Sequence, residues 1–496
     1  MTTQAHDEAG QRRDVDLLVT GRVITMVPGA MPIENGALAV DGGDIVACGP
    51  AADIEARFAS RRRLGGARAI VMPGMIDAHT HCTQCFVRSL TANELPMIPR
   101  IYNPAQRALS PDQAASAVRL LTAQLLASGI TTVCEGTLNP DHEESILEAL
   151  AEMGVRAVMA RGNADQEFYH AALYRQTHET SWAKPRDGAA EADLMRTEEM
   201  LRRYPPRGRQ LIRAAVNASS LLGFSERYFR DGAELARRHN TTIQVHVGRD
   251  REEVEFSLAV WGRRPIERLA DLGVVDRHLV AVHCVLANES EIEILARGGA
   301  ALAHSPIECV ANMNGVPNLP RFRAAGIRVA LGCDNQANDM FANMRGCWLV
   351  HGAKWGLPTY DPAFLDARDI LAMATREAAD VLAIEDRVGT LEVGKAADMV
   401  ILDGDRPHLF ATHDLETELV RYGSRAEIMQ TIVEGRVLYD RGEYATIDME
   451  RLRADAIRGA ADMRTAVEGR RYMPLRRSDA GAPAEARLRG VSTAGS

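Results

Sequence analysis

Short apolar runs alternate with amphipathic stretches through the middle of the chain. Runs of strand length recur eight times, at residues 69–79, 131–136, 155–162, 211–218, 241–248, 279–284, 300–306 and 328–335. The segments between them have helical patterns, and in one of these Ser110-Pro111 is typical of a helix start and Gly129 of a helix end. Eight strand–helix units in series predict an α/β protein whose residues 69–387 form a parallel (β/α)8 TIM barrel.

The two flanks of this region have a different pattern. Residues 15–68 and 388–446 contain β-branched runs separated by glycine, proline and other turn residues, which predicts short antiparallel strands. The simplest arrangement pairs the two flanks into one small composite β-sandwich domain. Residues 447–474 are predicted to form a C-terminal helix, whereas residues 1–14 and 475–496 are predicted to be disordered.

Composition and charge narrow the class of protein. The chain has 496 residues, of which 46% are hydrophobic and 25% are charged, as in soluble globular proteins. Its net charge of −9 provides no basic field that would attract nucleic acid or anionic lipid. We therefore expect a small-molecule substrate, with neither nucleic acid nor membrane as a partner. Tryptophans and apolar helix faces outside the barrel predict a homo-oligomer of unspecified order.

The sequence also predicts a compartment. No run reaches the roughly 18 uncharged apolar residues that a membrane span needs, and the N-terminal residues lack the apolar core of a signal peptide. The eight cysteines are scattered through apolar segments without the spacing of a disulfide framework. These features predict a cytoplasmic protein.

Histidine and aspartate side chains follow the apolar runs at the points where the predicted strands end. His79 and His81 close the first run, and their spacing allows both imidazoles to face one point. The later runs end in the same way, with His246, His283, His304 and Asp334 after the fifth, sixth, seventh and eighth. Barrel active sites lie at the C-terminal ends of the strands, so these residues predict a functional site. Imidazole nitrogens with one carboxylate suit a divalent transition metal and argue against Mg²⁺ or Ca²⁺.

Several of these segments together resemble the amidohydrolase superfamily. The matching segments are V-M-P-G-M-I-D-A-H-T-H at 71–81, the strand-end His246, V-H-C around His283 and G-C-D-N at 332–335. The resemblance covers residues 15–446 and is strongest to the branch of S-adenosylhomocysteine and methylthioadenosine deaminases, melamine deaminase and s-triazine chlorohydrolases. It implies that His79, His81, His246 and Asp334 bind one divalent metal, with zinc expected and iron as the alternative.

The resemblance also implies how the remaining residues act. His283 is expected to contact the attacking water or the attacked group, and Asp334 to accept the proton of that water. Some relatives hold a second metal on a carboxylated lysine at the fourth strand. Lysine occurs in this chain only at 184, 354 and 395, away from that strand, so a single metal is expected.

One residue departs from the deaminase pattern. That branch places a glutamate three residues after the fifth-strand histidine, where it manages a proton, but this chain has Arg249 at that position. A guanidinium stays charged and does not shuttle protons. Glu308, in the loop after the seventh strand, is the candidate replacement. Gln84 and Arg88, which follow the first histidine pair, are expected with His304 and Arg249 to contact the substrate.

The predicted function is hydrolysis of a non-peptide C–N bond by a metal-activated water. The bond joins an amino or alkylamino group to an sp² carbon, or belongs to an amide or carbamate, and the expected substrate is a small heterocyclic molecule. Because Arg249 replaces the glutamate, hydrolytic displacement of chloride or a thiolate stays open, since such groups leave without needing a proton. A protein that binds the metal or a ligand without catalysis is the remaining alternative.

Overall fold

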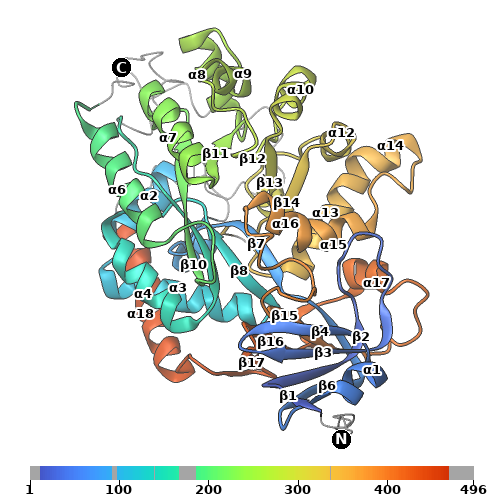
Figure 1. The fold of residues 1–496 in the computed structure, drawn as a ribbon. Coiled ribbons are helices and arrows are strands. Elements are labelled where there is room, and N and C mark those ends of the chain that lie inside the picture. Colours follow the sequence, from blue (N-terminus) through green and yellow to red (C-terminus); the bar gives the residue numbers. More distant parts are fainter. Residues whose placement is uncertain (1–11, 92–97, 139, 167–185, 336, 469–496) are drawn as a thin grey trace, which may run out of the picture.

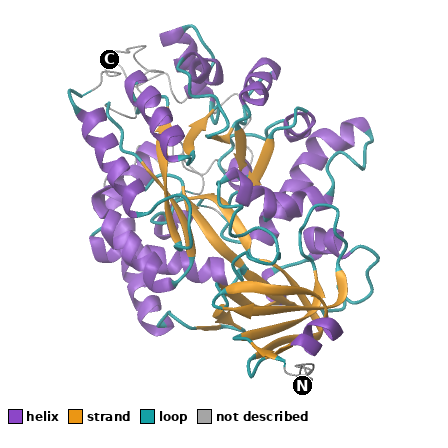
Figure 2. Ribbon diagram, in the orientation of Figure 1, coloured by secondary structure: helices purple, strands orange, loops and turns teal. Residues whose placement is uncertain are grey.

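The chain folds into a barrel of parallel strands covered by helices and a smaller β domain (Figures 1 and 2). The computed structural model describes residues 12–91, 98–138, 140–166, 186–335 and 337–468. In Figure 1 the β domain lies at the bottom and combines blue and orange segments from the two ends of the chain. The predicted (β/α)8 barrel with a composite β domain is therefore confirmed.

Eight parallel strands form the barrel in the order in which they follow along the chain. They are β7 (Met75–Thr80), β8 (Ile130–Glu135), β9 (Arg156–Arg161), β10 (Ile212–Ser220), β11 (Ile243–Val247), β12 (Leu279–His283), β13 (Ala301–His304) and β14 (Arg328–Leu331). Each predicted run overlaps one of them. A parallel bridge between Thr80 and Asp334 brings the first and last strands together, and the Asp334 N–H donates to the His79 carbonyl at 2.8 Å.

Helices cover the outside of the barrel. The predicted helix start at Ser110 is confirmed, because the Ser110 hydroxyl and the Gln113 side chain cap each other's N–H groups at the start of α3. The barrel helices are α3 (Pro111–Leu126), α4 (Glu143–Met153), α6 (Ala189–Arg203), α7 (Glu226–His239), α8 (Arg251–Trp261), α9 (Pro265–Asp271), α10 (Glu289–Gly298), α11 (Pro306–Ala311), α12 (Leu319–Ala324), α13 (Met340–His351), α15 (Ala367–Met373) and α16 (Arg376–Val381). Other helical segments are η1 (Cys85–Leu90), η2 (Ile98–Tyr102), α2 (Asn103–Ala108), η3 (Pro140–His142), η4 (Gly352–Gly356), α14 (Leu357–Thr359), α17 (Leu415–Tyr422) and η5 (Arg425–Glu427).

The small domain is built on an eight-stranded sheet to which both ends of the chain contribute. Its order is β18-β17-β16-β15-β6-β2-β3-β4. The strands are β2 (Leu17–Val23), β3 (Ile33–Asp41), β4 (Asp44–Pro50), β6 (Arg63–Pro73), β15 (Met399–Asp403), β16 (Ile428–Val433), β17 (Arg436–Asp440) and β18 (Glu443–Tyr444). Val19, Val71, Ile401 and Ile432 belong to one apolar cluster. Residues from both flanks therefore share one core, as a composite domain requires.

The chain passes from the small sheet to the barrel at Gly74, so the predicted boundary between residues 68 and 69 is wrong. The run 69–79 contains the end of β6, in the small sheet, and the start of β7, in the barrel. A side chain at Gly74 would place its Cβ only 2.1 Å from Thr131 Oγ1, which explains the glycine. Both strand segments are buried here, so the hydrophobic pattern shows no break between them.

The N-terminal prediction is wrong for two residues. Arg13 and Asp14 form strand β1 (Arg13–Asp14), although residues up to 14 were predicted to be disordered. β1 pairs in parallel with β5 (Phe58–Ala59), which follows helix α1 (Ala51–Arg57), and Arg13 lies 2.6 Å from Asp41. So short a strand leaves no periodic pattern in the sequence. Residues 1–11 and the predicted tail 475–496 lie outside the described residues.

The C-terminal helix α18 (Met449–Glu468) packs against the segment that follows the first barrel strand. Its side chains Met463 and Val467 share an apolar cluster with Phe86 and Val87 of η1. Asp462 also accepts a hydrogen bond from Gln113 at 2.8 Å. The helix predicted for residues 447–474 is thus present within the described residues, and it supports a loop at the barrel mouth.

A buried ion pair connects the barrel to the small domain. Arg156, at the start of β9, is fully buried and donates to Asp398 through Nε at 2.9 Å and through Nη2 at 3.2 Å. Its Nη2 also donates to Glu434 at 3.1 Å. Asp398 in turn accepts from the Glu434 N–H at 2.9 Å. These contacts fix the bottom of the barrel against the sheet.

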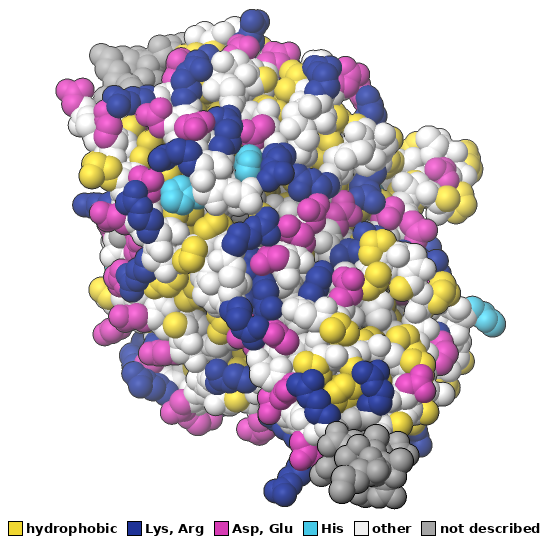
Figure 3. Space-filling model, viewed as in Figure 1, with side chains coloured by type: hydrophobic (Ala, Val, Ile, Leu, Met, Phe, Trp, Pro, Cys, Tyr) yellow, Lys and Arg dark blue, Asp and Glu magenta, His cyan; other side chains and the backbone are white. Residues whose placement is uncertain are grey.

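The surface carries side chains of both charges (Figure 3), and the described helices are short or polar. On the face in Figure 3, basic and acidic side chains are interspersed and neither sign forms a continuous patch. Among the described residues, every helix is too short or too polar to be a membrane span.

Candidate metal centre

The four predicted metal ligands lie together at the C-terminal ends of the barrel strands. His246 Nε2 on β11 is 3.1 Å from His79 Nε2 at the end of β7. Asp334, three residues after β14, has its Oδ2 3.6 Å from His79 Nε2 and its Oδ1 3.8 Å from His81 Nε2. Strand ends from three parts of the barrel therefore bring three imidazoles and one carboxylate to one point, as the sequence predicted.

His283 lies beside this group and faces it. Its Nε2 is 3.7 Å from Asp334 Oδ2, while its Nδ1 is 3.6 Å from Cys309 Sγ. The backbone is left-handed at His283, Cys284 and Asp334, with φ of 74°, 48° and 52°. Residues with a Cβ adopt this conformation at a free-energy cost, and such strain is common at functional sites.

Hydrogen bonds to Asp77 and the lack of side chains at two glycines hold His79 in place. Asp77 Oδ1 accepts hydrogen bonds from the His79 N–H at 3.2 Å and the Cys333 N–H at 2.8 Å, which joins β7 to the segment after β14. A Cβ at Gly136 would lie 2.3 Å from His79 Cε1, and a Cβ at Gly332 would lie 2.9 Å from the His79 carbonyl oxygen. The His79 ring can occupy its place only because residue 136 has no side chain.

A second layer of polar groups orients the other imidazoles. The carbonyl oxygen of Ser219 is 2.9 Å from His246 Nδ1, which makes Nδ1 the donor and leaves the Nε2 lone pair toward the cluster. Glu135 Oε1 lies 3.6 Å from His81 Nδ1, and the same carboxylate accepts from the Thr137 N–H at 2.8 Å. Sequence reasoning missed Glu135, although it ends β8 just as His246 lies at the end of β11.

Burial determines the charge of these groups. It lowers the pKa of His79 to about 3 and those of His246 and His283 well below the ordinary value, with neighbouring histidines adding to the effect. His81 is the exception, because although burial acts to lower its pKa, the nearby carboxylates of Glu135 and Asp334 raise it above the ordinary value. Neutral imidazole is the form that binds metals.

The predicted substrate contacts differ in how they are held. Gln84 accepts a hydrogen bond from Asn335 at 2.8 Å, and Arg88 donates to Gln124 at 3.1 Å. Arg249 donates to the Asp250 carboxylate at 2.6 Å. Each of these three side chains is therefore oriented by a protein partner.

His304 belongs to a separate buried group. Its Nε2 is 3.0 Å from His351 Nε2 on α13. The Sγ of Cys347, on the same helix, lies within 4.8 Å of a ring nitrogen of each histidine. Burial lowers the pKa of His304 to about 3 and that of His351 well below its ordinary value, so both rings are neutral. The pair therefore fixes the His304 ring against α13.

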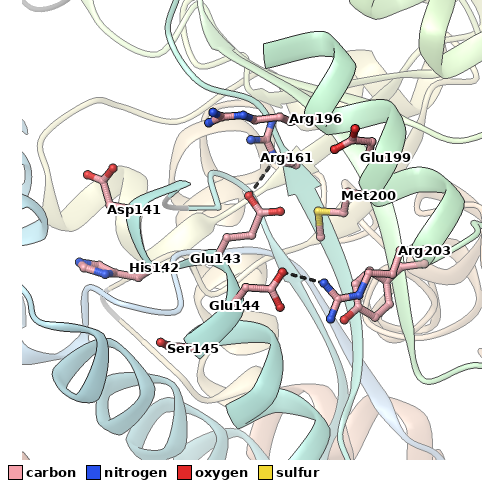
Figure 4. A pocket seen from close by; sticks show the side chains of 11 residues that line it. Asp141, His142, Glu143, Glu144, Ser145, Arg161, Arg196, Glu199, Met200 and Arg203 are labelled. Carbon is pink, nitrogen blue, oxygen red and sulfur yellow. Dashed lines mark hydrogen bonds and ion pairs between the residues drawn. The ribbon is translucent and has the colours of Figure 1, made fainter. Parts of the chain in front are cut away.

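The cavity in Figure 4 is distinct from the metal centre. It measures about 480 Å³ and lies between the start of α4 and the helix α6. Two ion pairs cross it, Arg161 with Glu143 at 2.9 Å and Arg203 with Glu144 at 2.6 Å. None of the side chains that line it belongs to the histidine cluster, so the chemistry of the barrel mouth does not extend into it.

Comparisons with known proteins agree with this geometry. The model of the amidohydrolase family matches residues 70–438. The 5-methylthioadenosine/S-adenosylhomocysteine deaminase of Syntrophobacter fumaroxidans is 31% identical over 455 residues, which are 90% of this chain and 98% of that protein. The enzyme of the same name from Symbiobacterium thermophilum is 29% identical over 425 residues, 85% of this chain and 92% of the other.

Solved structures of similar proteins have the same fold. A zinc-bound adenosine deaminase from Xanthomonas campestris superposes with a TM-score of 0.81 and 28% identity, covering 92% of this chain and all of that one. A zinc complex of atrazine chlorohydrolase from Arthrobacter aurescens superposes with a TM-score of 0.77 at 22% identity, covering 90% of this chain and all of that one, and it shows the shared fold. The chain belongs to the amidohydrolase family and is a metal-dependent hydrolase of carbon–nitrogen bonds other than peptide bonds.

Proposed function

We propose that this chain hydrolyses the bond between an sp² carbon and an amino or alkylamino group of a small heterocyclic molecule. The convergence of three histidines and Asp334, with His283 beside them, is the observation that carries the proposal. The deaminase names of the relatives support an amino group as the leaving group. An amide or carbamate C–N bond would be attacked by the same residues and is the alternative substrate form.

The donor set fits one divalent ion. Ligands about 2.0–2.1 Å from a tetrahedral ion lie about 3.3 Å apart, close to the separations of 3.1–3.8 Å among His79, His81, His246 and Asp334. Asp334 Oδ1 is buried without a hydrogen-bond partner among the described residues, as expected of a ligand atom. Three imidazoles and a carboxylate favour zinc, with iron as the alternative. When bound, such an ion supplies hydroxide at neutral pH by lowering the pKa of water from about 15.7 toward 7.

Two residues of the chain then divide the work at the carbon that is attacked. Asp334 is placed to accept the proton of the attacking water, because its carboxylate faces the cluster and burial raises its pKa above the ordinary value. His283 is neutral and directs Nε2 at the same point, so its N–H stabilises the negative charge that develops on the attacked group.

Gln84, Arg88 and Arg249 would hold the substrate. Gln84 and Arg88 approach from the loop after β7, and Arg249 from the loop after β11. Arg249 offers only donors, so it suits a substrate edge that carries acceptor atoms. His304 is fully buried and its Nε2 is engaged by His351, so the substrate contact expected of it from the sequence is not part of this proposal.

Metal analysis tests the first part of the proposal. Protein purified without added metal is expected to contain one equivalent of zinc or iron by elemental analysis. His79→Ala is expected to lose both the metal and the activity, whereas His408→Ala, a change at an exposed histidine of the small domain, should keep both. Two equivalents per chain in the wild type, or full activity of His79→Ala, would contradict the ligand assignment.

Product analysis tests the reaction. The wild-type enzyme is expected to release ammonia or an amine from members of a panel of aminated heterocycles, amides and carbamates. Release of chloride or thiolate without amine from matched substrates would replace the proposal with the displacement reaction, which tolerates Arg249 in place of a proton-transferring glutamate. Ligand binding with no product across the whole panel would indicate a non-catalytic protein.

Two expectations from the sequence stay predictions. Homo-oligomerisation is measured by light scattering on purified protein, and a monomer would contradict it. The cytoplasmic location, with neither membrane nor nucleic acid as a partner, is checked by fractionating cells and assaying the fractions for the protein and for bound nucleic acid.

A further inference from the structure

Glu308 is a buried carboxylate next to the metal centre, and its second oxygen lacks a partner. It lies on α11, which begins two residues after the end of β13, and it is 3% exposed. One oxygen accepts a hydrogen bond from Asn312, one helical turn later. The other, Oε2, is buried with no hydrogen-bond partner among the described residues. An unpartnered buried oxygen destabilises the fold, so its presence calls for a functional explanation.

Glu308 lies close to His283, which faces Asp334. Polar side-chain atoms of Glu308, His283 and Cys309 lie within 4.8 Å of one another. His283 in turn has its Nε2 3.7 Å from Asp334 Oδ2. Burial and the negative charge of Asp334 raise the pKa of Glu308, against a smaller opposite effect of Arg249. Glu308 therefore sits on the same side of the site as the two residues that act on the attacked carbon.

The segment after β11 also holds a buried carboxylate, but among the described residues it belongs to no cluster with His283 or Asp334. Arg249 occupies the place where the deaminase pattern has a glutamate, and its guanidinium stays charged. The buried carboxylate is Glu253 on α8, whose Oε2 accepts from the Arg249 N–H at 3.1 Å and whose Oε1, like Oε2 of Glu308, is buried without a hydrogen-bond partner among the described residues. The Glu253 N–H is itself capped by Asp250 at the start of α8. Glu253 therefore fixes the loop and α8, and it is the matched control for Glu308.

We propose that Glu308 donates the proton to the departing nitrogen, and that Asn312 is a positioning residue that holds the carboxyl group for this transfer. The inference rests on the proposed function, because it assigns the one proton that Asp334 and His283 leave unassigned. It also explains how the chain tolerates Arg249, since the proton donor has moved from the loop after β11 to the loop after β13.

The step balances in atoms and charge. The water oxygen forms a bond to the sp² carbon while its proton passes to Asp334. The C–N bond breaks with its electron pair on nitrogen, and Glu308 gives its proton to that nitrogen, so that a neutral amine or ammonia leaves. Asp334 then releases its proton to solvent and Glu308 takes one up, which restores the starting state.

The test compares leaving groups on one ring. The ring with the highest wild-type turnover in the panel is prepared with an amino, an anilino and a chloro substituent, because less basic groups need a proton less. Glu308→Gln keeps the size of the side chain and its contact with Asn312. We expect it to reduce amine release by about 10²–10⁴-fold, with a loss that shrinks toward the chloro compound. Metal content should remain one equivalent, as in the wild type.

Two further variants make the result decisive. Glu253→Gln should keep wild-type rates for all three leaving groups. Asn312→Ala should lower kcat for the amino compound with KM little changed, and with a smaller loss for the chloro compound. Amine release by Glu308→Gln at the wild-type rate, or an equal loss for all three leaving groups, would overturn the inference while the proposed function stands. A wild-type enzyme that releases no amine would overturn the proposed function and the inference together.

Discussion

Gly136 is the position where the fit of the metal centre is most sensitive to a single methyl group. In Gly136→Ala the new Cβ would lie 2.3 Å from His79 Cε1 and 2.4 Å from His79 Nδ1. Carbon atoms in contact prefer about 3.5–4.0 Å, so the His79 ring must move by about 1 Å. Metal–ligand distances tolerate only about 0.2 Å. We expect the metal affinity to fall by about 10–100-fold or more, which corresponds to about 1.4–2.8 kcal/mol.

The assay is a competition between the protein and a chelator of known affinity, followed by elemental analysis of the protein fraction. Gly49→Ala serves as the control, because the nearest atom to its Cβ would be Ile54 Cδ1 at 3.8 Å, an ordinary contact. Circular dichroism should show that both variants are folded. Wild-type metal affinity in Gly136→Ala would refute the reasoning, because it would mean that His79 is either not a ligand or not confined by residue 136.

Three further predictions concern stability. Asp398→Asn leaves the buried charge of Arg156 poorly compensated and should lower the free energy of unfolding in urea by about 3–5 kcal/mol; a loss below about 1 kcal/mol would contradict it. Burial raises the pKa of Glu253 to about 8, so the folded state keeps a proton that the unfolded state loses near pH 4. Wild-type stability should therefore decline relative to Glu253→Gln as the pH rises from 5 to 8 in urea titrations, and parallel curves would show that the pKa of Glu253 is not raised. Gly459→Val would place a Cβ 2.6 Å from Phe86 Cε2. This variant should lower the free energy of unfolding by about 1–3 kcal/mol and raise KM for the substrate, and an unchanged melting temperature would show that the contact is loose.

Much of the fold was predictable because strands of a parallel barrel are buried and leave short apolar runs. Eight runs in sequence order gave eight strands in the same spatial order. The boundary at Gly74 was not predictable from this pattern, because β6 and β7 are both apolar where they meet although they belong to different sheets. The ion pair of Arg156 with Asp398 was equally hidden, since it joins segments far apart in the sequence.

The residues at and beside the metal centre differ in how far the sequence predicts their positions. His79, His246 and Asp334 were found because parallel strands end at one edge of a barrel, so a polar residue at a strand end has a known position. The same rule applies to Glu135 at the end of β8, and extending it to every polar residue type would have found that partner of His81. No such rule applies to Asn312. Its proposed role depends on the oxygen of Glu308 that it holds, and this contact depends on how α11 leaves its strand and packs at the barrel mouth. The proposed metal ligands can therefore be placed from the chain alone, whereas the residue that we propose to orient the proton donor requires the folded structure.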